Sequence, residues 1–236
     1  MAPLQVEWLG RVPYADALEL QREVLEARRE AGAVDRLLLL EHPAVVTLGR
    51  STKPENLRLG PDELRARGIE RHEISRGGDV TYHAPGQLVG YLIRDLRAAA
   101  PADAAGAQAA PDLHVFLRTM ETALIDALSA AGLAGRRVEG RTGVFMDASL
   151  TRGGPDRKIA SIGIGVRHWI TYHGFALNVS VDLSGFDVIV PCGLADVEMT
   201  SVAAELERAG AADDAFSGLD TRVRQQVSAS FERHFG

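Results

Sequence analysis

Hydrophobic residues along the chain follow two different spacings, and each spacing predicts one kind of element. Positions i, i+3, i+4 and i+7 are apolar over residues 113–128, and Gly132 follows as a stop signal. This stripe predicts an amphipathic helix whose apolar side packs in the core. Further helical patterns predict four more helices, over residues 13–31, 61–68, 200–209 and 219–234.

Short apolar runs predict the strands. They cover residues 37–41, 44–48, 89–93, 144–146, 159–166 and 174–181. In the last two runs apolar residues nearly alternate with others, which is typical of antiparallel sheet. We therefore expect an α/β fold of the α+β type, with a mixed, largely antiparallel sheet flanked by helices.

The same patterns predict one domain over residues 1–236, because no internal repeat and no long linker divides the chain. Residues 97–111 are rich in alanine and include Pro101, Gly106 and Pro111, so they carry little apolar bulk. We expect this stretch to be an exposed insertion rather than a domain boundary.

Composition narrows the class of protein. Hydrophobic residues make up 46% and charged residues 25%, as in ordinary soluble domains. No apolar run reaches the ~18 residues of a membrane helix, and we expect no secretory leader and no membrane association. The net charge of −6 argues against general nucleic-acid binding. A single cysteine excludes an internal disulfide and suits a reducing, cytoplasmic location.

The most informative segment is the polar, glycine-rich run over residues 76–88. It places Arg76, Asp79 and His83 around two adjacent glycines and ahead of a Pro-Gly turn. Glycines let a ligand approach the backbone and meet its N–H groups. Either glycine pair alone is common in structural turns, but the combination with charged groups favours a loop that faces a ligand.

Three other segments carry candidate chemical groups. Lys158 opens an apolar strand, His173 precedes a glycine within another strand, and Cys192 lies in a Pro-Cys-Gly turn. Taken alone, each residue type is more often structural. A turn is commonly exposed, however, and an exposed thiol next to a cation becomes reactive.

Together these segments resemble the signature of the lipoyl(octanoyl) transferases. The family motifs correspond to residues 76–83 with 85–87, 158–163, 173–178 and 191–193, in the family's order, and the resemblance spans about residues 10–210. Ala84 departs from the glycine that the family often has there. The alanine-rich stretch looks like an insertion.

The resemblance implies transfer of an octanoyl group from octanoyl-acyl carrier protein to a lysine of a lipoyl domain, a step of lipoate biosynthesis. The acceptors would be lipoyl domains of 2-oxoacid dehydrogenase complexes and the glycine-cleavage carrier protein. Cys192 would form an acyl-thioester, and Lys158 would lower the pKa of its thiol and move protons. The implied fold is the catalytic domain shared by biotin and lipoate protein ligases.

The resemblance also implies which residues bind the substrate: Arg76, Gly77, Gly78, Asp79, Val80, Thr81, Tyr82, His83, Ser161, Ile162, Gly163, Gly174, Phe175 and Ala176. Elementary chemistry adds two expectations. Backbone N–H groups of Gly77 and Gly78 are candidate donors to the tetrahedral oxyanion. The acyl chain needs an apolar slot, for which the candidates are Ile162, Ile164, Phe175 and Leu177.

No cofactor is expected, because transfer from a thioester to an amine is downhill and the chain lacks a Gly-x-x-x-x-Gly-Lys-Ser/Thr phosphate loop. Scattered histidines and one cysteine give no metal-site spacing. Two alternatives stay open: an ATP-dependent lipoate or biotin ligase, which does not need Cys192, and a non-catalytic carrier-binding protein.

Docking of acidic carrier proteins would need a local cationic patch on this acidic chain. Residues 136–158 contain six cations against three carboxylates and end at Lys158. We therefore expect a cationic surface there, formed by Arg136, Arg137, Arg141, Arg152, Arg157 and Lys158.

Overall fold

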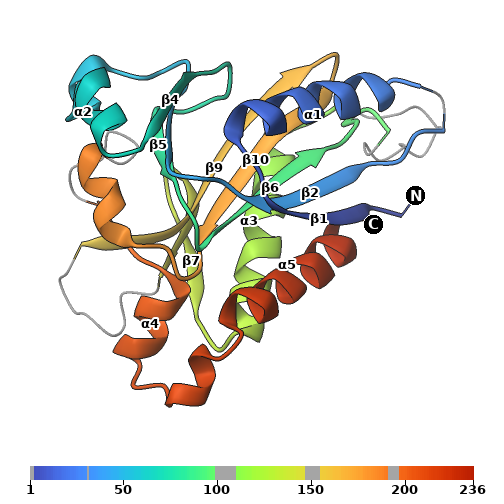
Figure 1. Cartoon of the computed structure of the whole chain (residues 1–236). Helices are drawn as coiled ribbons and strands as arrows, with labels where there is room; N and C mark the ends of the chain where they lie inside the picture. Colours follow the sequence, from blue (N-terminus) through green and yellow to red (C-terminus); the bar gives the residue numbers. More distant parts are fainter. Residues whose placement is uncertain (1–2, 31, 99–109, 147–154, 191–196) are drawn as a thin grey trace.

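The computed structural model describes residues 3–30, 32–98, 110–146, 155–190 and 197–236. Within them, the largest element is an eight-stranded sheet in the order β1-β2-β6-β10-β9-β8-β7, with β11 paired to β9 (Figure 1). Only the β1–β2 and β9–β11 pairs of this sheet are parallel. Its strands are β1 (Gln5–Arg11), β2 (Arg36–Glu41), β6 (Gln87–Ile93), β7 (Gly135–Val138), β8 (Arg141–Met146), β9 (Asp156–Arg167), β10 (Ile170–Asn178) and β11 (Val197–Met199).

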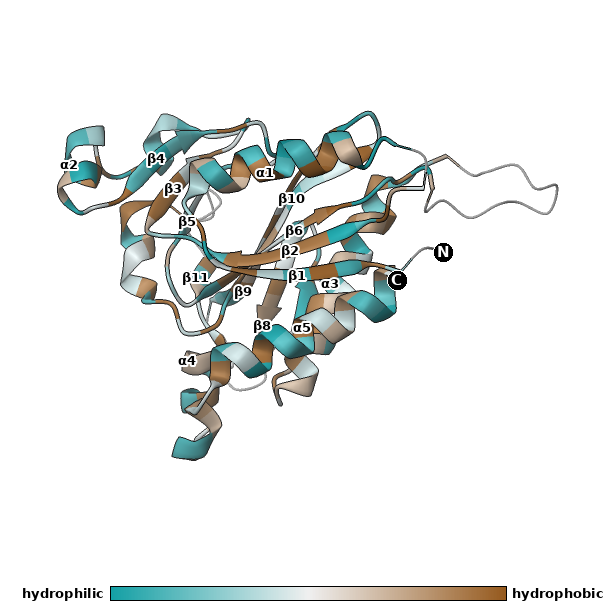
Figure 2. Ribbon diagram, turned by 45° about the vertical axis from the view of Figure 1, so that its right-hand side comes forward, coloured by the Kyte–Doolittle hydropathy of each residue, from teal (hydrophilic) through white to brown (hydrophobic). Residues whose placement is uncertain are grey.

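Helices cover both faces of this sheet. Helix α1 (Tyr14–Ala27) lies on one face, and α3 (Leu113–Ala130) packs with α5 (Leu219–Phe235) on the other (Figure 1). The short helix α4 (Val202–Arg208) follows β11. In Figure 2 the central strands are mainly brown, while the helices alternate between brown and teal. Within the described residues, every helix is too short or too polar to span a bilayer.

The leucine run of β2 shows why this strand lacks polar alternation. Leu37 and Leu39 pack in the cluster beneath α3 and α5, whereas Leu38 and Leu40 pack in the cluster beneath α1. Successive side chains of a strand point to opposite faces, so a strand covered on both sides is apolar throughout. Each buried leucine contributes about 1.5–3 kcal/mol through the apolar surface it removes from water.

A smaller sheet of three strands lies beside the large one: β4 (Glu70–Glu73), β3 (Val45–Leu48) and β5 (Val80–His83). Its apolar side packs against α2 (Pro61–Ala66) and the 3₁₀ turn Leu183–Val188. Two further 3₁₀ turns cover Pro54–Asn56 and Asp213–Phe216.

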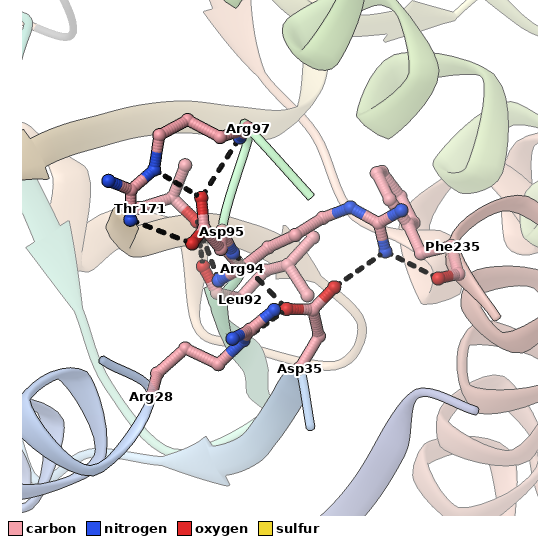
Figure 3. Close-up of polar contacts among 8 residues, drawn as sticks. All are labelled: Arg28, Asp35, Leu92, Arg94, Asp95, Arg97, Thr171 and Phe235. Carbon is pink, nitrogen blue, oxygen red and sulfur yellow. Dashed lines mark hydrogen bonds and ion pairs between the residues drawn. The ribbon is translucent and has the colours of Figure 1, made fainter. Parts of the chain in front are cut away.

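Buried charges join the end of the large sheet to two helices (Figure 3). Arg94 follows β6, is 6% exposed, and pairs with Asp35 at 3.0 Å. It also donates to the backbone carbonyl of Phe235 near the C-terminus of α5. Asp35 in turn accepts from Arg28, the C-cap of α1, at 2.7 Å. Burial lowers the pKa of Arg94 from its usual value. Removing one partner would leave the other charge buried and unpaired, so the network fixes these helix ends.

Most of the expected helices and strands are confirmed, with shifted ends. Helix α1 stops at Ala27, four residues before the expected end, and the chain then turns back through Gly32. Strand β10 stops at Asn178 because the N–H groups of Val179 and Ser180 donate to Gly86 instead. Strands β1, β4, β5, β7 and β11 were not expected, and most of residues 97–111 lie outside the described part.

Candidate active site

The sequence motifs come together around a cavity of about 280 Å³. Its walls combine residues of β5 in the small sheet with residues of β8, β9 and β10 in the large sheet. Of the residues expected at the site, thirteen line it: Arg76, Gly78, Asp79, Val80, Thr81, His83, Lys158, Ser161, Ile162, Gly163, Gly174, Phe175 and Ala176.

Gly77 and Tyr82 do not line the cavity. The N–H of Gly77 donates to the carbonyl of Ile164 at 2.8 Å, so the expectation that this group faces an oxyanion is wrong. The ring of Tyr82 packs edge-on against Phe186, with ring centroids 5.4 Å apart. Side chains alternate along β5, so Tyr82 points into the small sheet's own core while His83 points into the cavity.

The apolar part of the cavity is smaller than expected. Ile162 and Phe175 line it, and Val89 adds a further aliphatic wall. Ile164 and Leu177 pack in the main core instead. The ring of Phe175 lies where a side chain on Gly90 would stand, because a Cβ there would be 2.2 Å from the ring.

Arg76 holds the glycine turn in place. It is 7% exposed, and its guanidinium donates to the carbonyl and hydroxyl of Thr47 at 2.9 and 3.0 Å and to the carbonyl of Gly77 at 3.0 Å. Gly163 leaves room for it, since a Cβ there would lie 3.2 Å from the Arg76 Cδ atom. These hydrogen bonds fix the Arg76 side chain and connect β3 to the glycine turn.

The end of the cavity near α1 is lined by aromatic and imidazole groups that stay neutral. Burial lowers the pKa of His83 and of His173 to about 3, and raises that of Tyr14 and Tyr91 above the usual tyrosine value. His42 lies behind them, with its pKa lowered to about 4 by burial. Neutral groups at this end of the cavity favour an uncharged part of a ligand there.

Two of these imidazoles have a defined tautomer. The Nδ1 of His42 donates to the carbonyl of Val12 at 2.7 Å, so its Nε2 accepts from the Tyr91 hydroxyl at 2.7 Å. The Nδ1 of His83 lies 2.7 Å from the Gln87 Oε1 atom and donates to it. Its Nε2 therefore carries no proton in the neutral ring.

Gln87 begins a buried hydrogen-bonded chain that crosses three sequence motifs. Its amide nitrogen donates to the Asn178 Oδ1 atom at 2.9 Å, and the Asn178 amide donates to the carbonyl of Thr200 at 2.8 Å. The N–H of Thr200 donates to the carbonyl of Lys158 at 3.0 Å. These bonds join His83 on the small sheet to Lys158 on the large one.

Lys158 is 3% exposed and reaches the cavity from β9. Its ammonium lies over the ring of Phe145, 5.5 Å from the centroid. The neighbouring Arg157 points away and forms a buried pair with Glu205, at 2.8 and 3.1 Å. This burial keeps Lys158 away from bulk water and at the cavity.

Cys192 lies outside the described residues, but both flanks of its segment are anchored beside the cavity. On one side, Val190 donates to the carbonyl of Asn56 at 2.8 Å, and the Asn56 amide donates to the cavity residue Asp79. On the other, β11 pairs with the start of β9, and Met199 lies opposite Lys158. The chain therefore enters this segment near Asp79 and leaves it near Lys158.

Sequence reasoning missed one wall of the cavity. Gly140, Arg141 and Thr142, at the turn between β7 and β8, line it, as does Tyr14 on α1. Arg141 was expected only in the cationic surface, and the other three residues lie in no motif. The pairing of β8 with β9 brings the β7–β8 turn to the cavity, and α1 brings Tyr14 there. The sequence did offer one signal for this wall, because a polar run with glycine directly precedes the apolar part of β8.

Carboxylates pair with the described arginines of the expected cationic surface, so these cations are less free than the sequence suggests, and the docking role stays a prediction. Arg137 pairs with Glu121 at 3.0 Å, and Arg157 pairs with Glu205. Arg136 and Arg141 share Asp156. Glu121 and Glu205 lie outside the segment that was counted. Arg152 lies outside the described residues.

Relatives of known activity decide the family. The family model of the lipoyl protein ligase A/B catalytic domain matches residues 13–219. An octanoyltransferase of Acidobacterium capsulatum is 48% identical over 199 residues, which cover 84% of this chain and 78% of that relative. One of Solibacter usitatus is 45% identical over 227 residues, covering 96% and 89%. The chain belongs to the octanoyltransferase family. It is an acyltransferase, as the motifs had indicated.

Solved structures confirm the fold expected for this family. A lipoate-protein ligase A bound with ATP superposes with a TM-score of 0.68 at 19% identity, covering 98% of this chain and 85% of that one. A bi-partite lipoate protein ligase of Thermoplasma acidophilum gives 0.66 at 18% identity, covering 99% and 84%. At such identities the likeness concerns the architecture alone.

Proposed function

We propose that this octanoyltransferase takes its acyl group from octanoyl-acyl carrier protein and passes it to a lysine of a lipoyl domain through a thioester on Cys192. The observation that carries the proposal is the burial of Lys158 at a cavity whose rim anchors both flanks of the Cys192 segment. The choice of octanoyl as the acyl group rests on the names of the relatives that are 45–48% identical.

The octanoyl chain occupies the cavity between Ile162, Phe175 and Val89 in this proposal. Each methylene that leaves water contributes about 0.8 kcal/mol to binding. The neutral state of His83 and His173 matters here, because a buried charge beside the chain would require solvation.

Acyl transfer then proceeds in two balanced steps. The thiolate of Cys192 attacks the donor thioester, the tetrahedral oxyanion collapses, and the carrier thiolate leaves with a proton from the Lys158 ammonium. The neutral Lys158 amine then accepts a proton from the incoming lysine ammonium. The free amine attacks the Cys192 thioester, the attacking nitrogen gives its second proton to solvent, and the amide forms as the thiolate is released. Because Gly77 is already hydrogen-bonded, Gly78 remains as a backbone donor candidate for the oxyanion.

Acceptors are lipoyl domains of 2-oxoacid dehydrogenase complexes and the glycine-cleavage carrier protein. Their lysine must reach the same thioester after the carrier leaves, so donor and acceptor use the cavity in turn. This order predicts ping-pong kinetics.

Intact mass measurement tests the covalent step. Incubation with octanoyl-acyl carrier protein and no acceptor should add one octanoyl group, removable by hydroxylamine, and Cys192→Ala should lose the adduct. An adduct that persists in Cys192→Ala removes the assignment. Full turnover of Cys192→Ser, dependent on ATP and free octanoate, would instead identify a ligase.

A further inference from the structure

Lys158 has an unusually close neighbour in the backbone of Gly143. A Cβ built on Gly143 would lie 2.8 Å from the Lys158 Cε atom and 3.4 Å from its Nζ atom. It would also lie 2.5 Å from the carbonyl oxygen of Ala160. The side chain of Lys158 therefore passes directly over a position where only glycine leaves room.

The conformation of Gly143 points to the same requirement. Its φ of +121° lies in a region that residues with a side chain rarely adopt. It sits in β8 just before the pairing with β9 shifts register, between Val144 and Phe145. Phe145 is the residue whose ring lies beneath the Lys158 ammonium. Gly143 and Phe145 thus both contact the side chain of Lys158, one through its backbone and the other through its ring.

A buried carboxylate on another element fixes Gly143. Glu121 on α3 is 1% exposed, and its Oε1 atom accepts from the Gly143 N–H at 3.1 Å. Its Oε2 atom accepts from Arg118 at 2.7 Å and from Arg137 at 3.0 Å. Both oxygens are therefore engaged, and two guanidinium groups offset the burial of the single carboxylate charge. The carboxylate thus holds the backbone of β8 in place beneath Lys158.

We propose that Gly143, held by Glu121, is the positioning residue that sets the side-chain path of Lys158 into the cavity. Neither residue touches the reacting atoms; each acts through Lys158. The inference rests on the proposed role of Lys158 as acid and base. A lysine that must donate and then accept a proton at fixed sites loses rate when its ammonium is displaced by even a fraction of a bond length.

A double-mutant cycle separates this role from a general effect on the sheet. Turnover is measured with octanoyl-acyl carrier protein for wild type, Gly143→Ala, Lys158→Ala and the double variant. The new methyl group presses on the Ala160 carbonyl in both backgrounds, but meets the Lys158 side chain only in one. We expect Gly143→Ala to lower kcat ~10²-fold with KM nearly unchanged, and to have little further effect once Lys158 is alanine. An equal loss in both backgrounds overturns the proposal.

Thiol reactivity supplies a readout that a purely structural role does not move. The pH profile of Cys192 alkylation in Gly143→Ala should shift toward that of Lys158→Ala. The matched control is Gly132→Ala at the end of α3, where φ is +81° and a Cβ meets nothing within 4 Å. This variant also places a side chain at a positive φ, but away from Lys158, and should keep the wild-type profile. The other ionisable side chains lining the described cavity are unchanged throughout: Tyr14, Arg76, Asp79, His83, Tyr91, Arg141 and His173.

Glu121 provides a second route if Gly143→Ala does not fold. Glu121→Gln keeps an oxygen for the Gly143 N–H, whereas Glu121→Leu removes it. We expect kcat of Glu121→Gln to stay within ~3-fold of wild type, and kcat of Glu121→Leu to fall only when Lys158 is present. If Glu121→Leu lowers kcat equally when Lys158 is alanine, Glu121 does not act through Lys158, and this part of the proposal is wrong.

The same measurements tell failure of this inference from failure of the proposed function. Absence of a Cys192 adduct in wild type, or wild-type turnover in Lys158→Ala, rejects the proposed chemistry. An adduct in wild type together with additive Gly143 and Lys158 effects rejects only the positioning role.

Discussion

At the level of single residues, three histidines near the cavity are kept neutral by burial. Their pKa values are lowered to about 3 for His83 and His173 and to about 4 for His42, with burial as the largest cause. The guanidinium of Arg76 lowers the pKa of His83 and His173 further. Each imidazole binds a proton more readily in the unfolded chain, where its pKa is near 6.5.

This difference predicts acid sensitivity that one substitution should reduce. Stability from a neutral His173 is complete above pH about 6.5 and is lost as the pH falls toward 3, at up to about 1.4 kcal/mol per pH unit. His173→Asn removes one titrating group, so the free energy of unfolding should depend less steeply on pH. Asparagine suits the site because the backbone φ of 60° is left-handed, a conformation that asparagine tolerates.

Urea unfolding at pH 8.5, 7.5, 6 and 5 measures the effect. Wild type should lose stability across this range faster than His173→Asn, and the two curves should be parallel above pH 7. Parallel curves at every pH would mean that His173 titrates normally in the folded protein.

At the level of elements, periodicity in the sequence predicts the helices and strands that pack fully into the core. The stripe from Leu113 to Leu128 gave α3, and the apolar runs gave β2 and β6. Strand β4 has the sequence Glu-Arg-His-Glu and is a strand only because Val45–Leu48 pairs alongside it. Strand β1 likewise depends on the partner β2, about thirty residues away. Such strands carry no local signal because the ladder partner is distant.

The site divides in the same way. Motif residues such as Arg76 and Ser161 could be predicted because resemblance marks them directly. Tyr14, Glu121 and Gly143 could not, since their roles arise from how α1, α3 and β8 pack against the motifs. A sequence pattern reports which residue types are present, but not which backbone they support.

The hydrogen-bonded chain through Asn178 yields a prediction at this scale. Asn178 is 1% exposed and joins Gln87 to Thr200, so it ties the small-sheet motif to the strand of Lys158. Asn178→Ala leaves one N–H of the Gln87 amide and the carbonyl of Thr200 without their Asn178 partners. We expect a loss of about 2–6 kcal/mol in the free energy of unfolding, from about 1–3 kcal/mol for each of the two groups.

Chemical denaturation measures this loss, with Ser180→Ala as the matched control. Ser180 is exposed, and among the described residues its hydroxyl bonds only to Asp220, at 2.7 Å, so loss of the hydroxyl should change stability by no more than about 0.5 kcal/mol. Equal effects of the two variants would show that the chain through Asn178 adds nothing beyond a surface hydrogen bond.

At the level of the whole molecule, the net charge of −6 and the folding of α3 against β7 decide what the arginines near Lys158 do. Linear counting gave residues 136–158 an excess of cations. Folding brings Glu121 and Glu205 against Arg137 and Arg157, so these cations stabilise the fold, while Arg137 stays partly exposed. Charge in a segment says little until the elements that cover it are known.

Charge reversal at Arg137 tests this reading. Arg137→Glu places a carboxylate against the buried Glu121, with Arg118 as the remaining partner. Because Arg137 is 39% exposed, we expect a loss of about 1–2 kcal/mol rather than the 3–5 kcal/mol of a fully buried pair. The melting temperature should fall. kcat/KM should change by the same factor for octanoyl-acyl carrier protein and for a small octanoyl thioester, since the damage reaches the site through Glu121 and Gly143. A loss confined to the protein-bound donor, with the melting temperature unchanged, would instead identify Arg137 as part of a docking surface.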